Sequence, residues 1–184
     1  GQWRGRKLGF GDSQGLRPTL DRVRETLFNW LSSDTYQANC LDLFSGSGAL
    51  GFEALSRGAS QVTMVDNNRS VCQQLKKNLD LLSSQKGKVI CDDAQTFLAH
   101  YQLQLQKNES DTKYSLVFLD PPFNQGLLKE CCQLLDIQQL LANNCLIYIE
   151  CEKQLSLDFI PTNWQQIKQK QTGQLAYYLY QQKE

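Results

Sequence analysis

The residues best suited to catalysis are Asp120-Pro121-Pro122-Phe123. They follow the apolar run 115–119, which predicts a buried strand. Two successive prolines, each without a backbone N–H, must end that strand. The Asp120 carboxylate and the Pro121 carbonyl could then accept hydrogen bonds from both N–H groups of an exocyclic amino group, and Phe123 could stack on the base. These residues predict methyl transfer to an amino nitrogen of a planar base.

A second loop, residues 42–48, suits a nucleoside cofactor. Gly46-Ser47-Gly48-Ala49-Leu50-Gly51 lies between a predicted strand and a predicted helix, and Asp66 follows Gly46 by twenty residues. Glycines let the backbone approach a ligand closely, and an acidic side chain accepts from ribose hydroxyls. The pattern is shared by NAD enzymes and by methyltransferases that use S-adenosylmethionine, and a tight turn without a ligand would also contain it.

Acidic residues near this loop favour S-adenosylmethionine. Asp42 precedes Phe44 and Ser45 and would lie near the charged amino-acid portion of the cofactor, whereas a pyrophosphate would gain nothing from that charge. Capping of neighbouring amides would also explain Asp42. Asp92 and Asp93 end a later predicted strand, where a carboxylate could meet the adenine amino group. Either could instead be the N-cap of the helix that begins at Ala94.

Strands and helices alternate along the chain, which predicts an α/β, doubly wound sheet that is mostly parallel. A helix is expected from Thr19, as its N-cap, to Leu31. Strands are expected at 40–44, 61–65, 88–91, 115–119 and 145–150, and further helices at 49–57, 68–82, 94–104 and 125–137. Residues 164–171 and 174–180 flank Thr172-Gly173 and predict a C-terminal antiparallel hairpin.

Composition indicates one ordinary globular domain over residues 1–184. Seven cysteines without a C-x-x-C pair favour reduced, buried thiols in a cytoplasmic protein, and a single histidine argues against a metal site. No apolar run is long enough to span a membrane. We expect a monomer.

Charge is unevenly distributed although the net charge is zero. Residues 1–24 carry a balance of +4, and five of their six cations are arginines. A basic arm at residues 1–17, with a short hairpin around Trp3–Leu8, is typical of nucleic-acid contact, because guanidinium groups pair with phosphates. A solvated charged face would have the same composition. Trp3 would stack on a base or pack in the core.

Together these motifs resemble a known family. The glycine loop with Asp120-Pro121-Pro122-Phe123 looks like amino-group methyltransferases that carry an Asn/Asp-Pro-Pro-aromatic motif. Segments 2–8 and 16–31, with Trp-Arg-Gly-Arg and Arg-Pro-Thr as their most specific parts, resemble the RsmD family of bacterial 16S ribosomal RNA guanine-N2 methyltransferases. Asp66-Asn67-Asn68 is a mild departure from that family's pattern.

The resemblance implies a Rossmann-like methyltransferase fold, S-adenosylmethionine as donor and 16S rRNA as partner, either as naked RNA or within a small-subunit assembly particle. The residues it implies fall into three groups. Those for catalysis are Asp120, Pro121, Pro122 and Phe123; those for the cofactor are Asp42, Phe44, Ser45, Gly46, Gly48, Asp66 and Asp93; those for RNA are Trp3, Arg4, Arg6, Lys7 and Arg17.

The sequence alone leaves three other functions open. An N6-adenine or glutamine methyltransferase would use the same acceptor geometry, commonly with Asn at position 120. An NAD-dependent oxidoreductase would share the glycine loop, but the chain has no Tyr-x-x-x-Lys and a single, late-helix histidine. A catalytically silent RNA-binding module would keep the fold without the chemistry.

Overall fold

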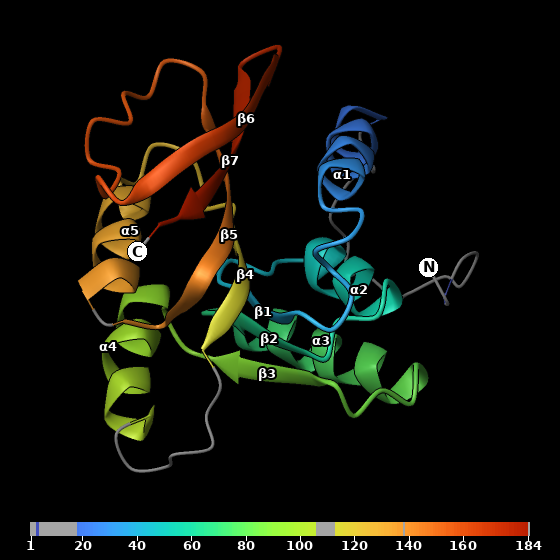
Figure 1. Cartoon of the computed structure of the whole chain (residues 1–184). Helices are drawn as coiled ribbons and strands as arrows, with labels where there is room; N and C mark the ends of the chain where they lie inside the picture. The colour runs from blue at the N-terminus through green and yellow to red at the C-terminus, as the bar shows by residue number, and fades with distance from the viewer. Residues whose placement is uncertain (1–2, 4–17, 106–112, 138, 184) are drawn as a thin grey trace.

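The strands of the described chain form one seven-stranded sheet in the order β3-β2-β1-β4-β5-β7-β6 (Figure 1). The computed structural model describes residues 3, 18–105, 113–137 and 139–183. Strands β1 to β5 are mutually parallel, β7 is antiparallel to β5, and β6 is antiparallel to β7. The strands are β1 Asn39–Asp42, β2 Gln61–Asp66, β3 Gly87–Cys91, β4 Tyr114–Leu119, β5 Leu141–Glu152, β6 Trp164–Thr172 and β7 Leu175–Gln182. The predicted doubly wound sheet and its C-terminal hairpin are confirmed.

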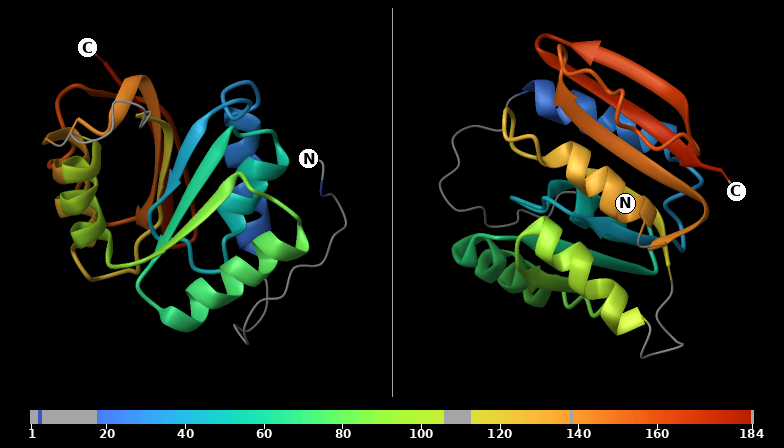
Figure 2. Two further views of the ribbon diagram at one scale, coloured as in Figure 1. Left: turned by 90° about the horizontal axis from the view of Figure 1, so that it is seen from below. Right: turned by 90° about the vertical axis from the view of Figure 1, so that its left-hand side faces the viewer.

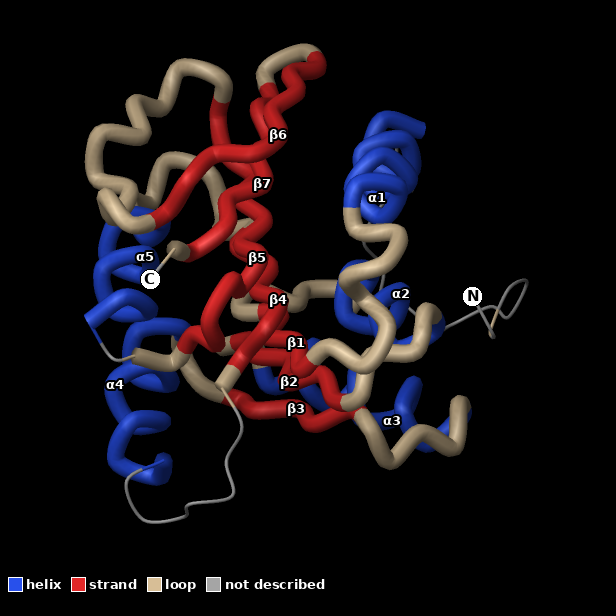
Figure 3. The backbone as a smooth tube through the Cα atoms, viewed as in Figure 1, coloured by secondary structure: helices blue, strands red, loops and turns tan. Residues whose placement is uncertain are grey.

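Helices cover both faces of the sheet (Figures 2 and 3). Alternate residues of each strand point to opposite faces of the sheet, so the sheet has an apolar core on each face. Helices α1, α2 and α3 contribute to one core, and α4 and α5 contribute to the other. Even-numbered Phe118 and Tyr148 face α1, whereas Val117 and Ile147 face α5. The helices are α1 Pro18–Trp30, α2 Ala49–Ser56, α3 Arg69–Leu81, α4 Ala94–Leu105 and α5 Leu127–Ile137.

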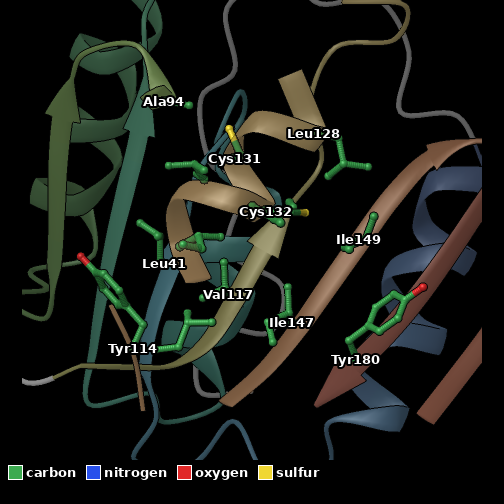
Figure 4. Packing of buried hydrophobic residues seen from close by; sticks show 14 of the residues in the cluster. Leu41, Ala94, Tyr114, Val117, Leu128, Cys131, Cys132, Ile147, Ile149 and Tyr180 are labelled. Atoms are coloured by element: carbon green, nitrogen blue, oxygen red, sulfur yellow. The ribbon is translucent and has the colours of Figure 1, made fainter. Parts of the chain in front are cut away.

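The core on the α4 and α5 side explains the apolar run before Asp120. Val117 and Leu119 of β4 are fully buried and belong to the same apolar cluster. Figure 4 shows Val117 among Cys131 and Cys132 of α5 and Ile147 and Ile149 of β5. A central parallel strand is covered on both faces, so its sequence is apolar at consecutive positions. Strand β4 is thereby a rigid base for the loop that follows it.

Three sequence-based expectations about local structure were wrong. Helix α1 begins at Pro18, so Thr19 lies inside the helix and is not its N-cap; proline suits the first helical position, where its missing N–H would have no partner. Strand β5 begins at Leu141 rather than at residue 145. The expectation that all seven cysteines are buried was wrong for Cys91. Cys91 is exposed because its strand, β3, lies at the sheet edge, whereas the other six cysteines are buried.

Within the described residues, no helix has both the length and the apolar character that a membrane crossing requires.

Candidate active site

The site lies where the strand order reverses, at the carboxyl ends of adjacent strands β1 and β4. Leu41 pairs with Val117 and Asp42 with Phe118, so the loops after both strands leave the same edge of the sheet side by side. Such a switch point is where open α/β sheets bind ligands, because the loops on either side diverge to opposite faces.

The glycine loop after β1 leaves open space beside Gly46. Gly48 precedes α2 with φ of 78°, and a Cβ there would come within 2.5 Å of Phe52 and 2.6 Å of Leu75. Gly46 has φ of 50° and nothing within 4 Å of the position of a Cβ. Gly48 is therefore required by packing and backbone conformation, while Gly46 leaves room for a ligand against the backbone.

Asp66, at the end of β2, is joined to this loop. One carboxylate oxygen accepts the Gly46 N–H at 2.9 Å, and the other accepts the Asn68 N–H at 2.9 Å. Each oxygen can accept a further hydrogen bond. Asp66 thus lies beside the loop as predicted for a ribose acceptor, while it also holds the loop's backbone.

Asp42 is buried against the first turn of α2. Its carboxylate accepts the Gly51 N–H at 3.0 Å, and its backbone carbonyl accepts the Ser45 hydroxyl at 2.8 Å. Burial raises the pKa of Asp42 to about 7, and the nearby Asp66 carboxylate adds to the rise, whereas hydrogen bonds from Gly51 and Ser45 oppose it. Amide capping is thus one function of Asp42, and its side chain also lines the cavity described below.

Asp93, predicted to contact the cofactor, serves as the N-cap of α4 in the structure. Its two carboxylate oxygens accept from the Thr96 backbone N–H at 2.9 Å and the Thr96 hydroxyl at 2.7 Å. The Thr96 hydroxyl and amide lower the pKa of Asp93, because they stabilise its ionised form. Asp92 accepts the Asp93 N–H at 3.0 Å.

The loop after β4 presents the predicted catalytic residues. Pro121 is buried, Pro122 is exposed, and Phe123 is 44% exposed. The carboxylate of Glu152 accepts the Asn124 N–H and ties the loop to β5. Burial raises the pKa of Asp120 well above its usual range, and the carboxylates of Glu150 and Asp42 raise it further.

Sequence reasoning missed Glu150. It is 7% exposed at the carboxyl end of β5, and it accepts the Tyr148 hydroxyl at 2.7 Å. Burial raises the pKa of Glu150, whereas the hydrogen bond from Tyr148 opposes the rise. The sequence did contain a signal for Glu150, since it is the one acidic residue in the apolar run 145–151. A carboxylate in a buried strand needs a hydrogen-bonding partner or a function.

A cavity of about 980 Å³ joins the two loops. It is lined by Phe44, Ser45, Gly46 and Ser47 on one side and by residues 120–123 on the other. Among the described residues that line it, Arg24 is the one cation, against seven acidic residues: Asp42, Asp66, Asp92, Asp93, Asp120, Glu130 and Glu150. Such a lining favours a cationic ligand and opposes a pyrophosphate.

The structure describes only one of the predicted RNA-binding residues. Trp3 is partly buried against the core on the α1 side, and its backbone N–H donates to the Ser56 hydroxyl at 3.2 Å. This observation supports the packing alternative for its ring. Arg4, Arg6, Lys7 and Arg17 lie outside the described residues. Among the described residues, no group of three or more possible ligands could hold a metal ion.

The fold and the acidic cavity define a class, the Rossmann-like methyltransferases that use S-adenosylmethionine. The family model described as Conserved hypothetical protein 95, the RsmD family, matches residues 1–181. The chain belongs to this family.

Similar proteins agree with this assignment. Ribosomal RNA small subunit methyltransferase D of Escherichia coli K12 is 50% identical over 98% of this chain and 87% of its own length. The protein of the same name in Haemophilus influenzae is 48% identical over 98% and 91%. The solved structure of Escherichia coli yhhF has a TM-score of 0.87 and 46% identity, covering 100% of this chain and 95% of that one.

A more distant structure shares the fold alone. The T. thermophilus 16S rRNA N2 G1207 methyltransferase, solved with AdoMet and guanosine, has a TM-score of 0.63 at 17% identity. It covers 96% of this chain, which spans 46% of that protein.

Proposed function

We propose that this chain transfers a methyl group from S-adenosylmethionine to the exocyclic N2 of a guanine in 16S ribosomal RNA. The observation that carries the proposal is the cavity that joins the glycine loop to residues 120–123, whose described lining holds seven acidic residues and one arginine. A sulfonium cofactor with an ammonium group fits that lining, whereas the pyrophosphate of NAD would be repelled by it. This contrast disfavours the oxidoreductase alternative.

The cofactor would be held by residues of the first three strand ends. Gly46 lies against the cofactor, whereas Gly48, which is not among the residues that line the cavity, keeps the loop in its conformation. Asp66 accepts from the ribose, and Asp93 or its neighbour Asp92 lies near the adenine. Asp42, Phe44 and Ser45 line the end where the charged amino-acid portion would bind. When bound, the cofactor supplies an electrophilic methyl group on a positively charged sulfur.

Asp120 and Pro121 would prepare the amino group for reaction. The lone pair of guanine N2 is delocalised into the ring, so the nitrogen must be turned toward tetrahedral geometry. The Asp120 carboxylate and the Pro121 carbonyl would each accept one amino hydrogen, and Phe123 would stack on the base to hold its plane. The target base must leave its stack to reach this cavity, as enzymes that act on base atoms require.

Beyond the cavity, the basic arm of residues 1–17 is proposed to contact RNA phosphates. The substrate is proposed to be 16S rRNA within a small-subunit assembly particle, whose proteins would add contacts that a short arm cannot supply. We further propose that the chain acts as a single-domain monomer in the bacterial cytoplasm.

Substitution of Asp120 tests the proposal. Asp120→Ala is expected to lower turnover by about 100-fold or more, as loss of one preorganised partner does in other enzymes. Affinity for S-adenosylmethionine, measured by calorimetry, should stay within a factor of three or so, because cofactor contacts come from other strands. Asp80→Asn removes an exposed carboxylate on α3 and serves as the control. Unchanged turnover in Asp120→Ala would refute the proposed catalytic function of Asp120. Absence of turnover in the wild-type protein would instead indicate the catalytically silent alternative.

Methyl-group mapping identifies the acceptor. We expect N2-methylguanosine in digests of small-subunit rRNA after incubation with the wild-type protein, detected by mass spectrometry. Methyl incorporation into DNA, into protein or at adenine N6 would favour the other amino-group methyltransferases.

A further inference from the structure

Asp120 and Glu150 lie next to each other at the edge of the cavity. Strands β4 and β5 are parallel, and Leu119 pairs with Ile149, so Asp120 and Glu150 follow as neighbours at the two strand ends. Their positions continue the alternation that turns Phe118 and Tyr148 toward α1. Both residues line the cavity that contains the glycine loop.

Tyr148 holds the Glu150 side chain in place. The Tyr148 hydroxyl donates to one carboxylate oxygen of Glu150 at 2.7 Å. The Tyr148 ring is fully buried, with the Phe118 ring centroid 6.5 Å away and the Tyr177 centroid 6.4 Å away. Phe28 and Trp30 of α1 extend this row of rings. A fixed hydroxyl therefore orients a carboxylate that is itself almost entirely buried.

The Glu150 carboxylate, which lines the cavity, can accept more hydrogen bonds than the one from Tyr148. Within the described chain, the hydrogen bond from Tyr148 is the one that the structure shows for this side chain. A carboxylate can accept several hydrogen bonds, and a buried one without enough partners is costly. A ligand in the cavity that brings an N–H donor beside Asp120 would remove that cost.

Guanine brings such a donor next to its reacting amino group. Its Watson–Crick edge carries N1–H directly beside the N2 amino group, so the edge presents adjacent donors. Adenine has an unprotonated N1 beside its amino group, and a carboxylate would repel that lone pair. Enzymes that extrude a base read it through hydrogen bonds to this edge.

We infer that Glu150, positioned by Tyr148, accepts a hydrogen bond from guanine N1–H and makes the site selective for guanine. The inference rests on the proposed function and deepens it. Asp120 and Pro121 act on the amino group itself, whereas Glu150 identifies the base that carries it. Tyr148 is a positioning residue, because it acts through Glu150.

A base analogue separates this inference from a structural function of Glu150. The substrate is small-subunit rRNA, assembled with its proteins, that carries by ligation either guanine or 2-aminopurine at the nucleotide methylated by the wild-type protein. 2-Aminopurine keeps the 2-amino group but has no hydrogen on N1. Methylation rates are measured for both substrates, and mass spectrometry identifies the methylated nucleoside.

We expect the wild-type protein to prefer guanine over 2-aminopurine. Glu150→Ala should lower the rate on guanine by about 10- to 100-fold, the effect of losing a hydrogen bond to a charged group. The rate on 2-aminopurine should stay the same or rise, because the carboxylate that repels its N1 lone pair is removed. Tyr148→Phe should reduce the same preference by a smaller factor, because the carboxylate remains but is less well oriented. Asp80→Asn is the control and should leave the preference unchanged.

Different outcomes overturn different claims. Equal loss on both substrates in Glu150→Ala, or no preference for guanine in the wild-type protein, would refute the inference while leaving the proposed function intact. Faster methylation of 2-aminopurine than of guanine would also refute it, since a protonated Glu150 would then donate to N1. Absence of N2-methylguanosine with the wild-type protein would refute the proposed function itself.

Discussion

The backbone N–H of Gly51 donates to the carboxylate of Asp42 at 3.0 Å and joins the first turn of α2 to the end of β1. A Cβ at position 51 would come within 2.9 Å of Met64 and 3.1 Å of that carboxylate oxygen. The close approach is possible because glycine has no side chain. The position of a proposed cofactor-binding carboxylate thus depends on one glycine in the facing helix.

Gly51→Ala should therefore weaken both folding and cofactor binding. We expect a loss of about 1–3 kcal/mol in the free energy of unfolding from overpacking, measured by denaturant titration, and weaker binding of S-adenosylmethionine by calorimetry. Gly173→Ala is a suitable control. Gly173 has φ of 58° with nothing within 4 Å of the place that a Cβ would occupy, so its replacement strains the hairpin turn away from the cavity. Unchanged cofactor affinity in Gly51→Ala would contradict the proposed place of Asp42 in the site.

Cofactor affinity should depend on pH through Asp42. Its pKa of about 7 means that the side chain is neutral below this value and negative above it. S-adenosylmethionine carries a sulfonium and an ammonium group, so its affinity should rise as the pH increases from about 6 to about 8 and then level off. Calorimetric titrations across this range provide the measurement. Asp42→Asn should bind more weakly and should lose this part of the pH dependence; the same pH profile in both proteins would exclude Asp42 as its cause.

Asp93 can be tested separately as a helix cap and as a cofactor contact. Serine is also a good N-cap, so Asp93→Ser should preserve stability to within about 0.5 kcal/mol, whereas Asp93→Ala should cost about 1 kcal/mol. Both variants should bind S-adenosylmethionine more weakly if the carboxylate contacts adenine. Thermal unfolding and calorimetry together distinguish the two functions. Wild-type affinity in Asp93→Ser would show that Asp93 only caps the helix. Asp92 would then be the candidate for the contact with adenine.

Glu152 should matter for catalysis although it lies outside the cavity lining. Its carboxylate accepts the Asn124 N–H and holds the loop that carries Phe123. Glu152→Ala is expected to reduce turnover by about 10-fold, because a loosened loop places the acceptors less accurately. Asn124→Gly keeps the N–H and relieves a φ of 60°, so it should retain near wild-type turnover. Single-turnover methylation rates provide the measurement, and full activity in Glu152→Ala would show that the anchor is dispensable.

The sequence was informative where local rules decide structure. The apolar run 115–119 predicted a strand covered on both faces, and the two prolines after it had to end that strand. The glycine loop could be placed between a strand and a helix in the same way. These local patterns also identified the two loops that meet at the cavity, since the carboxyl ends of parallel strands share one edge.

Tertiary structure alone decided which side chains share that cavity. Glu150 is separated from Asp120 by thirty residues and becomes its neighbour through the register of β4 and β5. The exposure of Cys91 and the packing of Trp3 follow from strand order and helix placement, which local propensity does not specify. The pKa of Asp42 likewise depends on burial beneath α2. Residue types determine what chemistry is possible, whereas long-range packing determines which charges are buried together and hence which ligand they accept.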